Sequence, residues 1–423
     1  MSDLAPELDK LSIITDDGSE FTAIESATVS STFLTPCDNF EIEIGGEFAL
    51  PDVAKKFALG KVVRIAVNDR VQMTGYVDAT RLSYREHGGS KLLVRGRDFL
   101  SPIVDGNVDP RIKVAPSMTI SDLVSLVILK EFGFTTYEIR DTPQAGDVAI
   151  GSGIKRGKYE SRHKRRSPIK ELRPHDQEGA FAYLARILTH YGYWMWADAD
   201  DFGVVISGPD YDQSPSFELT CKYDPQATGA GRVNNIISAD ATTDQTNIPS
   251  HVFLRGVDSG AGTKTAVKAM AVNPLVSLFK PAYVVDRDSH TKEMAETRAR
   301  FFSAKQMRHF FQYECEVRGF SDPATGNVYN ANTVGTVKDE ITGTDGPLWV
   351  FGRRFRKSRD GGTRTSLTMI PLGTLLLDWQ DDSPPAVAPD YGAVSTNVGA
   401  QSPLKTDAFA VNGTQFYNSE AAA

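Results

Sequence analysis

Residues 75–106, GYVDATRLSYREHGGSKLLVRGRDFLSPIVDG, decide the fold that we expect for this chain. Apolar or small residues alternate with polar ones over 71–80, which is the period of a half-buried β-strand. The alternation changes phase beyond Arg81, so we expect a β-bulge near Thr80 and Arg81, the bend that a small barrel needs. The sequence HGGS at 87–90 predicts a hairpin turn, after which the chain runs back as a second strand.

The composition is that of an ordinary soluble globular protein of more than one domain. The chain has 423 residues, 40% of them hydrophobic and 24% charged, and a single core stops growing near ~250–300 residues. A net charge of −8 argues against a general nucleic-acid-binding protein. Three cysteines far apart in sequence predict buried thiols in a reducing compartment. No secretory signal and no membrane-spanning apolar run are evident, so we expect folding in the cytoplasm.

The pattern of residue types changes along the chain and predicts four segments. Short strands with Gly and Asn/Asp turns fill the first 105 residues and indicate a barrel or sandwich. Helices are predicted at 117–133 and 178–191, followed by a hairpin over 194–206, and a second β-rich region contains one helix at 292–305 capped by Ser289. The predicted boundaries are 1–108 for a first β-barrel, 109–210 for an α/β insertion, 211–379 for a second β-barrel, and 380–423 for an extended or disordered arm.

Three short motifs in the opening stretch carry a family resemblance. They are G-Y-V-D at 75–78, V-x-G-R-D at 94–98 and Ile103-Val104-Asp105. Their order resembles the first barrel of the central baseplate hub proteins of contractile-tailed phages, of the Mu tail-protein-P type. In this comparison Gly96, Arg97 and Asp98 form a structural turn.

The resemblance implies both an architecture and a role. The fold is expected to be mainly β with an α+β part: two related small barrels of the tail-tube type, separated by the insertion. A homotrimer is then expected to form a ring of six barrels that joins the six-fold tail tube to the three-fold spike and lets viral DNA pass during genome ejection. The implied partners are a tail tube or tube-initiator protein above, a spike below and baseplate wedge proteins around it. The implied location is the tail baseplate of the virion, assembled in the host cytoplasm.

The sequence carries no recognisable motif for a cofactor, a metal or a catalytic site. The loop at 260–265 lacks the glycine that directly precedes the lysine of a phosphate loop, and 151–157 fails the dinucleotide pattern. The seven histidines have no metal-ligand spacing, and no nucleophile elbow occurs. The sequence therefore predicts no cofactor, no metal site, no catalytic residues and no enzymatic activity.

Two other functional classes stay open. Tail proteins can carry a peptidoglycan hydrolase, and Asp198, Asp200 and Asp201 are close together, although acidic residues in a hairpin turn are explained by local hydrogen bonding. A carbohydrate-binding tail module is favoured if exposed tryptophans and tyrosines lie along a groove. Core packing is the simpler explanation for the four tryptophans, which are Trp194, Trp196, Trp349 and Trp379.

The densest positive charge lies in a loop at 154–173. We select six of its residues as a candidate partner interface: Lys155, Arg156, Arg162, Lys164, Arg165 and Arg166. Three interpretations stay open, namely a solvated loop, a docking loop for an acidic face of a neighbouring tail protein, and a contact with the DNA in the tail.

Overall fold

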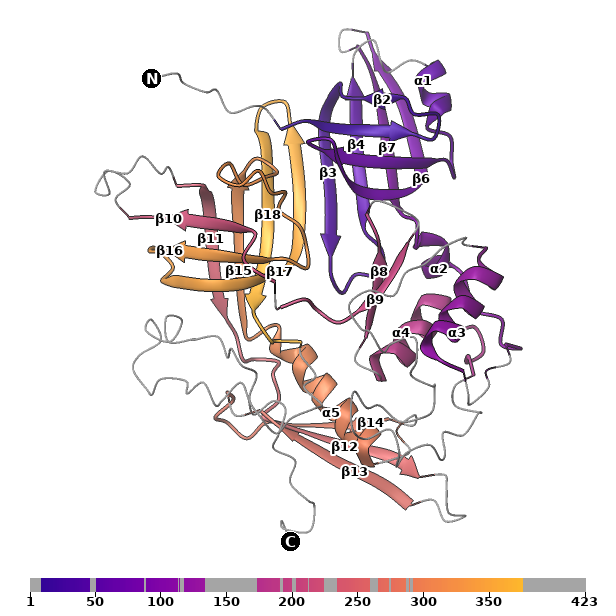
Figure 1. The fold of residues 1–423 in the computed structure, drawn as a ribbon, viewed down its shortest axis with the longest axis vertical. Coiled ribbons are helices and arrows are strands. Elements are labelled where there is room, and N and C mark those ends of the chain that lie inside the picture. Colours follow the sequence, from indigo (N-terminus) through magenta and orange to yellow (C-terminus); the bar gives the residue numbers. More distant parts are fainter. Residues whose placement is uncertain are drawn as a thin grey trace.

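Strands from both ends of the chain form one continuous sheet (Figure 1). The fold is given by a computed structural model, which describes residues 9–45, 51–86, 89–112, 114, 118–133, 173–190, 193–199, 203–211, 213–223, 234–258, 265–273, 275–286, 289 and 292–375. Within these residues the sheet has 13 strands, so the protein is mainly β, as the sequence predicted. The arm predicted at 380–423 lies outside the described residues, and so does the basic loop predicted at 154–173 apart from Arg173.

The first β-region comprises the strands up to residue 98, in the spatial order β3-β4-β7-β6-β5-β1-β2. Its elements are β1 (Leu11–Thr15), β2 (Glu20–Phe21), β3 (Ile24–Thr32), β4 (Asn39–Gly45), α1 (Pro51–Lys56), β5 (Val62–Val67), β6 (Arg70–Arg85) and β7 (Gly89–Asp98). Strand β4 shows why they form: Phe40, Ile42 and Ile44 are buried, and the glutamates between them are not.

The hairpin β6–β7 confirms the turn that the sequence predicted. Arg85 pairs with Gly89, and Gly89 has φ +70°, a conformation that favours glycine. The register shifts between Val77 and Ala79, so the bulge lies before the predicted Thr80 and Arg81. Gly75 and Ala79 are small enough to fit either face of the sheet, so the sequence does not show where the alternation changes phase.

The strands of the second β-region lie in the order β11-β15-β18-β17-β16-β10. Strand by strand, this order corresponds to β3-β4-β7-β6-β5-β1 in the first β-region. Its elements are β10 (Phe217–Cys221), β11 (Ile236–Thr243), β15 (Phe311–Arg318), β16 (Val334–Asp339), β17 (Thr344–Ser358) and β18 (Gly362–Pro371). One difference is clear: β10 runs parallel to β16, whereas β1 runs antiparallel to β5.

The register also repeats between the two regions. Phe40 pairs with Gly96 across β4 and β7, and Tyr313 pairs with Met369 across β15 and β18, each partner 273 residues further on. The β-bulge after Val77 recurs after Val350 at the same spacing. The hairpin glycines share the spacing and the positive φ, at Gly89 and Gly362.

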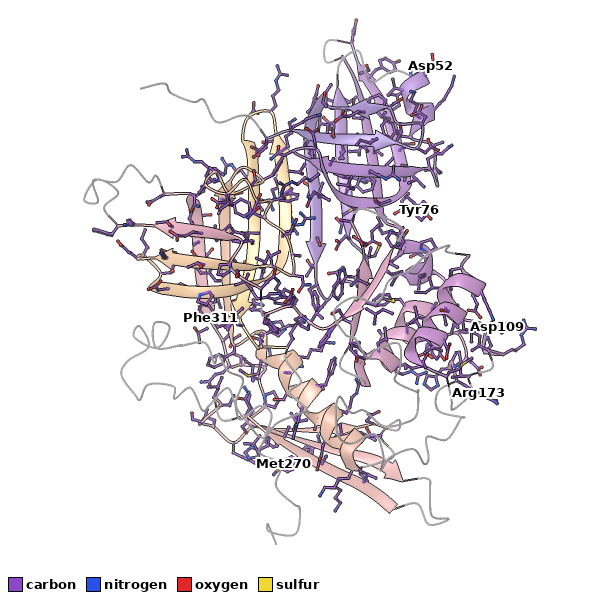
Figure 2. The ribbon with its side chains drawn as sticks, in the orientation of Figure 1. Asp52, Tyr76, Asp109, Arg173, Met270 and Phe311 are labelled. Atoms are coloured by element: carbon purple, nitrogen blue, oxygen red, sulfur yellow. The ribbon has the colours of Figure 1, made fainter. Side chains whose placement is uncertain are left out.

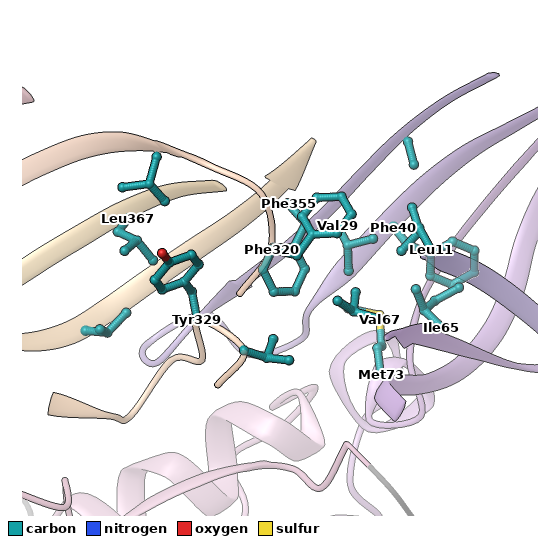
Figure 3. Packing of buried hydrophobic residues seen from close by; sticks show 14 of the residues in the cluster. Leu11, Val29, Phe40, Ile65, Val67, Met73, Phe320, Tyr329, Phe355 and Leu367 are labelled. Atoms are coloured by element: carbon teal, nitrogen blue, oxygen red, sulfur yellow. The ribbon is translucent and has the colours of Figure 1, made fainter. Parts of the chain in front are cut away.

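The two β-regions meet where β17 pairs with β3. This pairing makes their sheets continuous, and one hydrophobic cluster extends through both (Figure 3). In the close view Val29 and Phe355 lie between Leu11 and Phe40 on one side and Tyr329 and Leu367 on the other.

A helical part follows the first β-region, with a core of its own. Its elements are α2 (Ser101–Asp105), α3 (Ile120–Val124), a π-helical segment (Ser125–Glu131), α4 (Ala180–His190), β8 (Trp194–Ala197) and β9 (Val204–Ser207). Thr119 caps α3, because its Oγ1 accepts a bond from the Asp122 amide while Asp122 accepts one from the Thr119 amide. Tyr76 of β6 packs against this core (Figure 2).

A separate three-stranded sheet lies between β11 and β15 in the chain. It consists of β12 (His251–Asp258), β13 (Thr265–Val272) and β14 (Pro281–Val285), and α5 (Lys292–Met307) covers one face (Figure 1). The second β-barrel predicted at 211–379 includes this stretch of the chain, whereas the structure places the three strands in a sheet of their own. The predicted cap Ser289 lies before α5, where its hydroxyl donates to Asp286.

Candidate functional site

The junction between β3 and β17 is the candidate functional site, because it joins the two β-regions. Seven residue pairs form it, from Gly352 opposite Thr32 to Ser358 opposite Ser26. On one face Phe355 lies opposite Val29, and the side chains are both 1% exposed. The junction is therefore built as core, with an apolar seam beneath the backbone pairing.

Arg353 extends this seam with a buried cation, only 7% exposed. Its Nη1 donates to Gln72 Oε1 at 2.6 Å and to Asn330 Oδ1 at 2.7 Å, and its Nη2 donates to the Gln72 carbonyl at 3.2 Å. The guanidinium lies 4.3 Å from the centroid of the Phe355 ring. One side chain of β17 thus holds the start of β6, in the other β-region.

The electrostatic setting of Arg353 is unusual for a buried charge. No salt bridge to it occurs among the described residues, and its Nε has no hydrogen-bond partner there. Burial lowers the pKa of Arg353 to about 10, and the nearby Asp38 opposes this shift. The guanidinium stays protonated at neutral pH, stabilised by amide and carbonyl oxygens rather than by an ion pair.

Two carboxyl groups lie next to this arginine at the end of the first β-region. Asp98 is 4% exposed and accepts hydrogen bonds from the amides of Asp38 (2.8 Å) and Leu100 (2.9 Å) and from the thiol of Cys37 (2.9 Å). Burial raises the pKa of Asp98. Burial and then the charge of Asp98 raise the pKa of Asp38, whose Oδ1 accepts from the Thr32 amide at 3.2 Å. Burial also raises the pKa of the Cys37 thiol, which makes it an unreactive group.

A polar cavity of about 690 Å³ lies among these groups, at the meeting of both β-regions and the β8–β9 hairpin. Thr74 and Ala199 both line it, and Thr74 Oγ1 donates to the Ala199 carbonyl at 2.7 Å. Its lining includes Ser31, Thr32, Asp38, Gln72, Thr74, Asp98, Asp198, Asn332 and Arg353. Of the three predicted aspartates only Asp198 is described; Asp200 and Asp201 lie outside the described residues.

The tripeptide Gly96-Arg97-Asp98 ends β7, and the turn begins after it, at Phe99. A Cβ at Gly96 would overlap the carbonyl oxygen of Tyr76 and the ring of Phe40. Arg97 donates to Asp78 at 2.6 Å and to both oxygens of Asp105 at 2.7 and 2.8 Å, so it ties the bulge in β6 to the end of α2. Each residue of the motif thus has a structural role. Gly96 lets the strands approach closely, Arg97 forms the ion pairs, and Asp98 accepts hydrogen bonds from neighbouring backbone amides.

The remaining predicted site residues are distributed as follows. The six basic residues between Lys155 and Arg166 lie outside the described residues, and so does Trp379. Trp349 is fully buried, while Trp194 and Trp196 are half-buried around Phe33, with ring centroids 6.0 and 5.0 Å from it. These three tryptophans pack together in one aromatic cluster at the junction.

Sequence reasoning missed Arg353, Gln72 and Asp38. One signal was available for Arg353, because two-residue periodicity places it on the same face as Phe355. No group of three or more His, Cys, Asp or Glu side chains among the described residues could hold a metal ion. In the same residues, no helix combines the length and apolar character required to cross a bilayer.

Comparison with protein families gives one match. Residues 12–98 match the family model described as Mu phage baseplate assembly protein GpP-like, N-terminal. This confirms the resemblance that the G-Y-V-D and G-R-D motifs indicated. Among curated proteins no match to the chain was found.

Solved structures share the fold over most of the chain. The tail protein from Neisseria meningitidis MC58 superimposes with a TM-score of 0.69 at 21% identity, covering 87% of this chain and 98% of that one. The 43 kDa tail protein of prophage MuSo2 from Shewanella oneidensis gives a TM-score of 0.64 at 17% identity, covering 87% and 100%. The prophage tail protein gp18 from Listeria monocytogenes EGD-e gives 0.50 at 10% identity, covering 85% and 94%.

Proposed function

We propose that this protein is a structural, non-catalytic baseplate hub of a contractile phage tail, acting as a homotrimeric adaptor between the six-fold tail tube and the three-fold spike. The GpP-like match over residues 12–98 and the fold shared with phage tail proteins support the tail and baseplate assignment. The adaptor role is what the resemblance to baseplate hub proteins implies, and the repeat within the chain is compatible with it.

The observation that carries the adaptor role is the repeated strand order and register of the two β-regions. Positions in β4, β6 and β7 recur 273 residues later in β15, β17 and β18, bulge included. We interpret the regions as two related barrel-type domains. Three copies of such a chain offer six similar barrel-type units around one axis, which would match a six-fold tube. The remaining parts of the chain occur three times, which would match a three-fold spike.

We propose for these units the boundaries that the sequence predicts. They are 1–108 and 211–379 for the two barrel-type domains, 109–210 for the insertion and 380–423 for the arm. The proposed partners are the tube or its initiator above, the spike below and wedge proteins around. Viral DNA passes through the centre, and the protein resides in the virion. The six basic residues between Lys155 and Arg166 would dock an acidic neighbour, since opposite charges steer association.

The mass of the full chain in solution tests this proposal. Light scattering at several concentrations should give a stable mass near three times 46.2 kDa. A monomer at every concentration would contradict the trimeric hub. Loss of turbidity of a cell-wall suspension on adding the purified protein would favour the hydrolase alternative instead.

A further inference from the structure

In the described residues, one strand edge in each β-region has no pairing partner where its counterpart in the other region has one. In β17, residues 344–349 pair with β16, and residues 352–358 pair with β3 along the same edge. In β6, the matching residues 70–76 pair with β5, but residues 79–85 have no partner on that edge among the described residues. Likewise β3 is enclosed between β4 and β17, whereas β11 pairs with β15 alone within the part of the chain that the structure describes.

The two unused edges are also exposed where their counterparts are buried. Phe355 and Val29 are both 1% exposed, while Leu82, the counterpart of Phe355, is 43% exposed. Tyr84, two residues further along β6, is 88% exposed. In β11, residues 240–243 are exposed throughout. Unpaired exposed edges attract other strands, so a protein that keeps two of them in matching positions needs an explanation.

We propose that β6 of one copy pairs antiparallel with β11 of a second copy, repeating between chains the β17–β3 junction found within the chain. We call this the intersubunit junction; it rests on the proposed trimeric function and specifies the surface that forms it. In the repeat, β6 is the counterpart of β17, and β11 is the counterpart of β3. Applying the β17–β3 register to these two counterparts places Leu82 opposite Ala241. The full set of pairs is Ala79–Asp244, Thr80–Thr243, Arg81–Thr242, Leu82–Ala241, Ser83–Asp240, Tyr84–Ala239 and Arg85–Ser238.

The side chains in this register are complementary on both faces. One face carries Leu82 and Tyr84 against Ala239 and Ala241, which corresponds to the apolar seam of Phe355 and Val29. The other face sets Arg81 diagonally between Asp240 and Asp244, within reach of a long side chain. A shift of one residue would place the apolar and charged sets on opposite faces, so the register is specified by both.

The topology of the pairing is also compatible with a closed ring. The edge of β6 and the edge of β11 are different surfaces, so each copy uses one edge on each neighbour, and such head-to-tail contacts form rings when the rotation closes. Junctions within and between chains then alternate around the ring. With six similar units, three chains close it and leave neither edge unpaired.

Disulfide trapping in the full chain tests the register. The double variant Leu82→Cys/Ala241→Cys should form covalent trimers on mild oxidation, since directly opposite residues on paired strands lie within disulfide reach. The matched control is Tyr84→Cys/Thr243→Cys, on the same strands but four residues out of register, about 13 Å apart. Each single variant controls for the three native cysteines, of which Cys37 and Cys315 are buried.

The outcomes separate the intersubunit junction from the proposed function. Covalent trimers from the first variant and none from the control support the junction. A trimeric mass without this cross-link, or with equal cross-linking in the control, overturns the junction and leaves the trimeric hub standing. A monomeric mass overturns the proposed hub, and the junction with it.

Discussion

Phe355 of β17 lies directly opposite Val29 of β3, 326 residues away in the chain, and both side chains are 1% exposed. The ring of Phe320 lies 5.1 Å from that of Phe355, so the seam continues into the core of the second β-region. The side chains that connect the two β-regions are therefore as buried as those in the core of either region.

The first prediction concerns this seam. Phe355→Ala should lower the free energy of unfolding by about 3–5 kcal/mol, because it removes a buried ring and leaves a cavity. Urea unfolding would measure the change. Ile341→Ala is the control: this side chain is 64% exposed in the turn before β17, and we expect its loss to change stability by under about 0.5 kcal/mol. Equal effects of the two substitutions would show that the seam is not part of the core.

The second prediction concerns charge across the intersubunit junction. Arg81→Glu would put a carboxylate beside Asp240 and Asp244, and we expect about a tenfold increase in the trimer dissociation constant. Adding Asp240→Arg to this variant should recover most of the loss, measured by sedimentation at low salt. Lys268→Glu on the exposed part of β13 serves as the control and should leave association unchanged. No recovery in the double variant would argue against the proposed register.

The third prediction concerns Gly96. In Gly96→Ala the added methyl would overlap the Tyr76 carbonyl and the Phe40 ring, and we expect a loss of about 1–3 kcal/mol in unfolding free energy. Gly208→Ala, where nothing lies within 4 Å of the added atom, should be tolerated. Thermal unfolding of the two variants side by side gives the comparison, and a fully stable Gly96→Ala would mean that β6 and β7 can separate at little cost.

The fourth prediction concerns pH and Asp38. Its pKa is raised above the ordinary 3.8, so the contribution of this carboxyl to folding is present below that value and is lost as the pH rises through the raised pKa. Asp38→Asn keeps an acceptor for the Thr32 amide but cannot ionise. The variant should gain stability relative to the parent as the pH increases from 5 to 8, by on the order of 1 kcal/mol. Parallel urea titrations at both pH values measure this difference; a constant difference would mean that Asp38 does not titrate in that range.

Local patterns were sufficient to predict most strands, but not their assembly. Alternating burial in Phe40, Ile42 and Ile44 is readable from the sequence, and so is the stop at Gly133, which has φ +73°. The separate sheet of β12–β14 was not predicted, because β12 pairs in parallel with β14 although β13 separates the two strands in the sequence, and nothing local specifies that pairing. The partners Gln72 and Arg353 are 281 positions apart, so their contact follows only from the pairing of β3 with β17.

The strand direction at one rim distinguishes the two halves of the chain. Because β10 runs alongside β16 in the same sense while β1 opposes β5, the backbone donors and acceptors there are spaced differently in each half. In the proposed trimer, a molecule that recognised these strands by main-chain contacts would therefore find every second unit of the ring suitable, and three copies of it would bind.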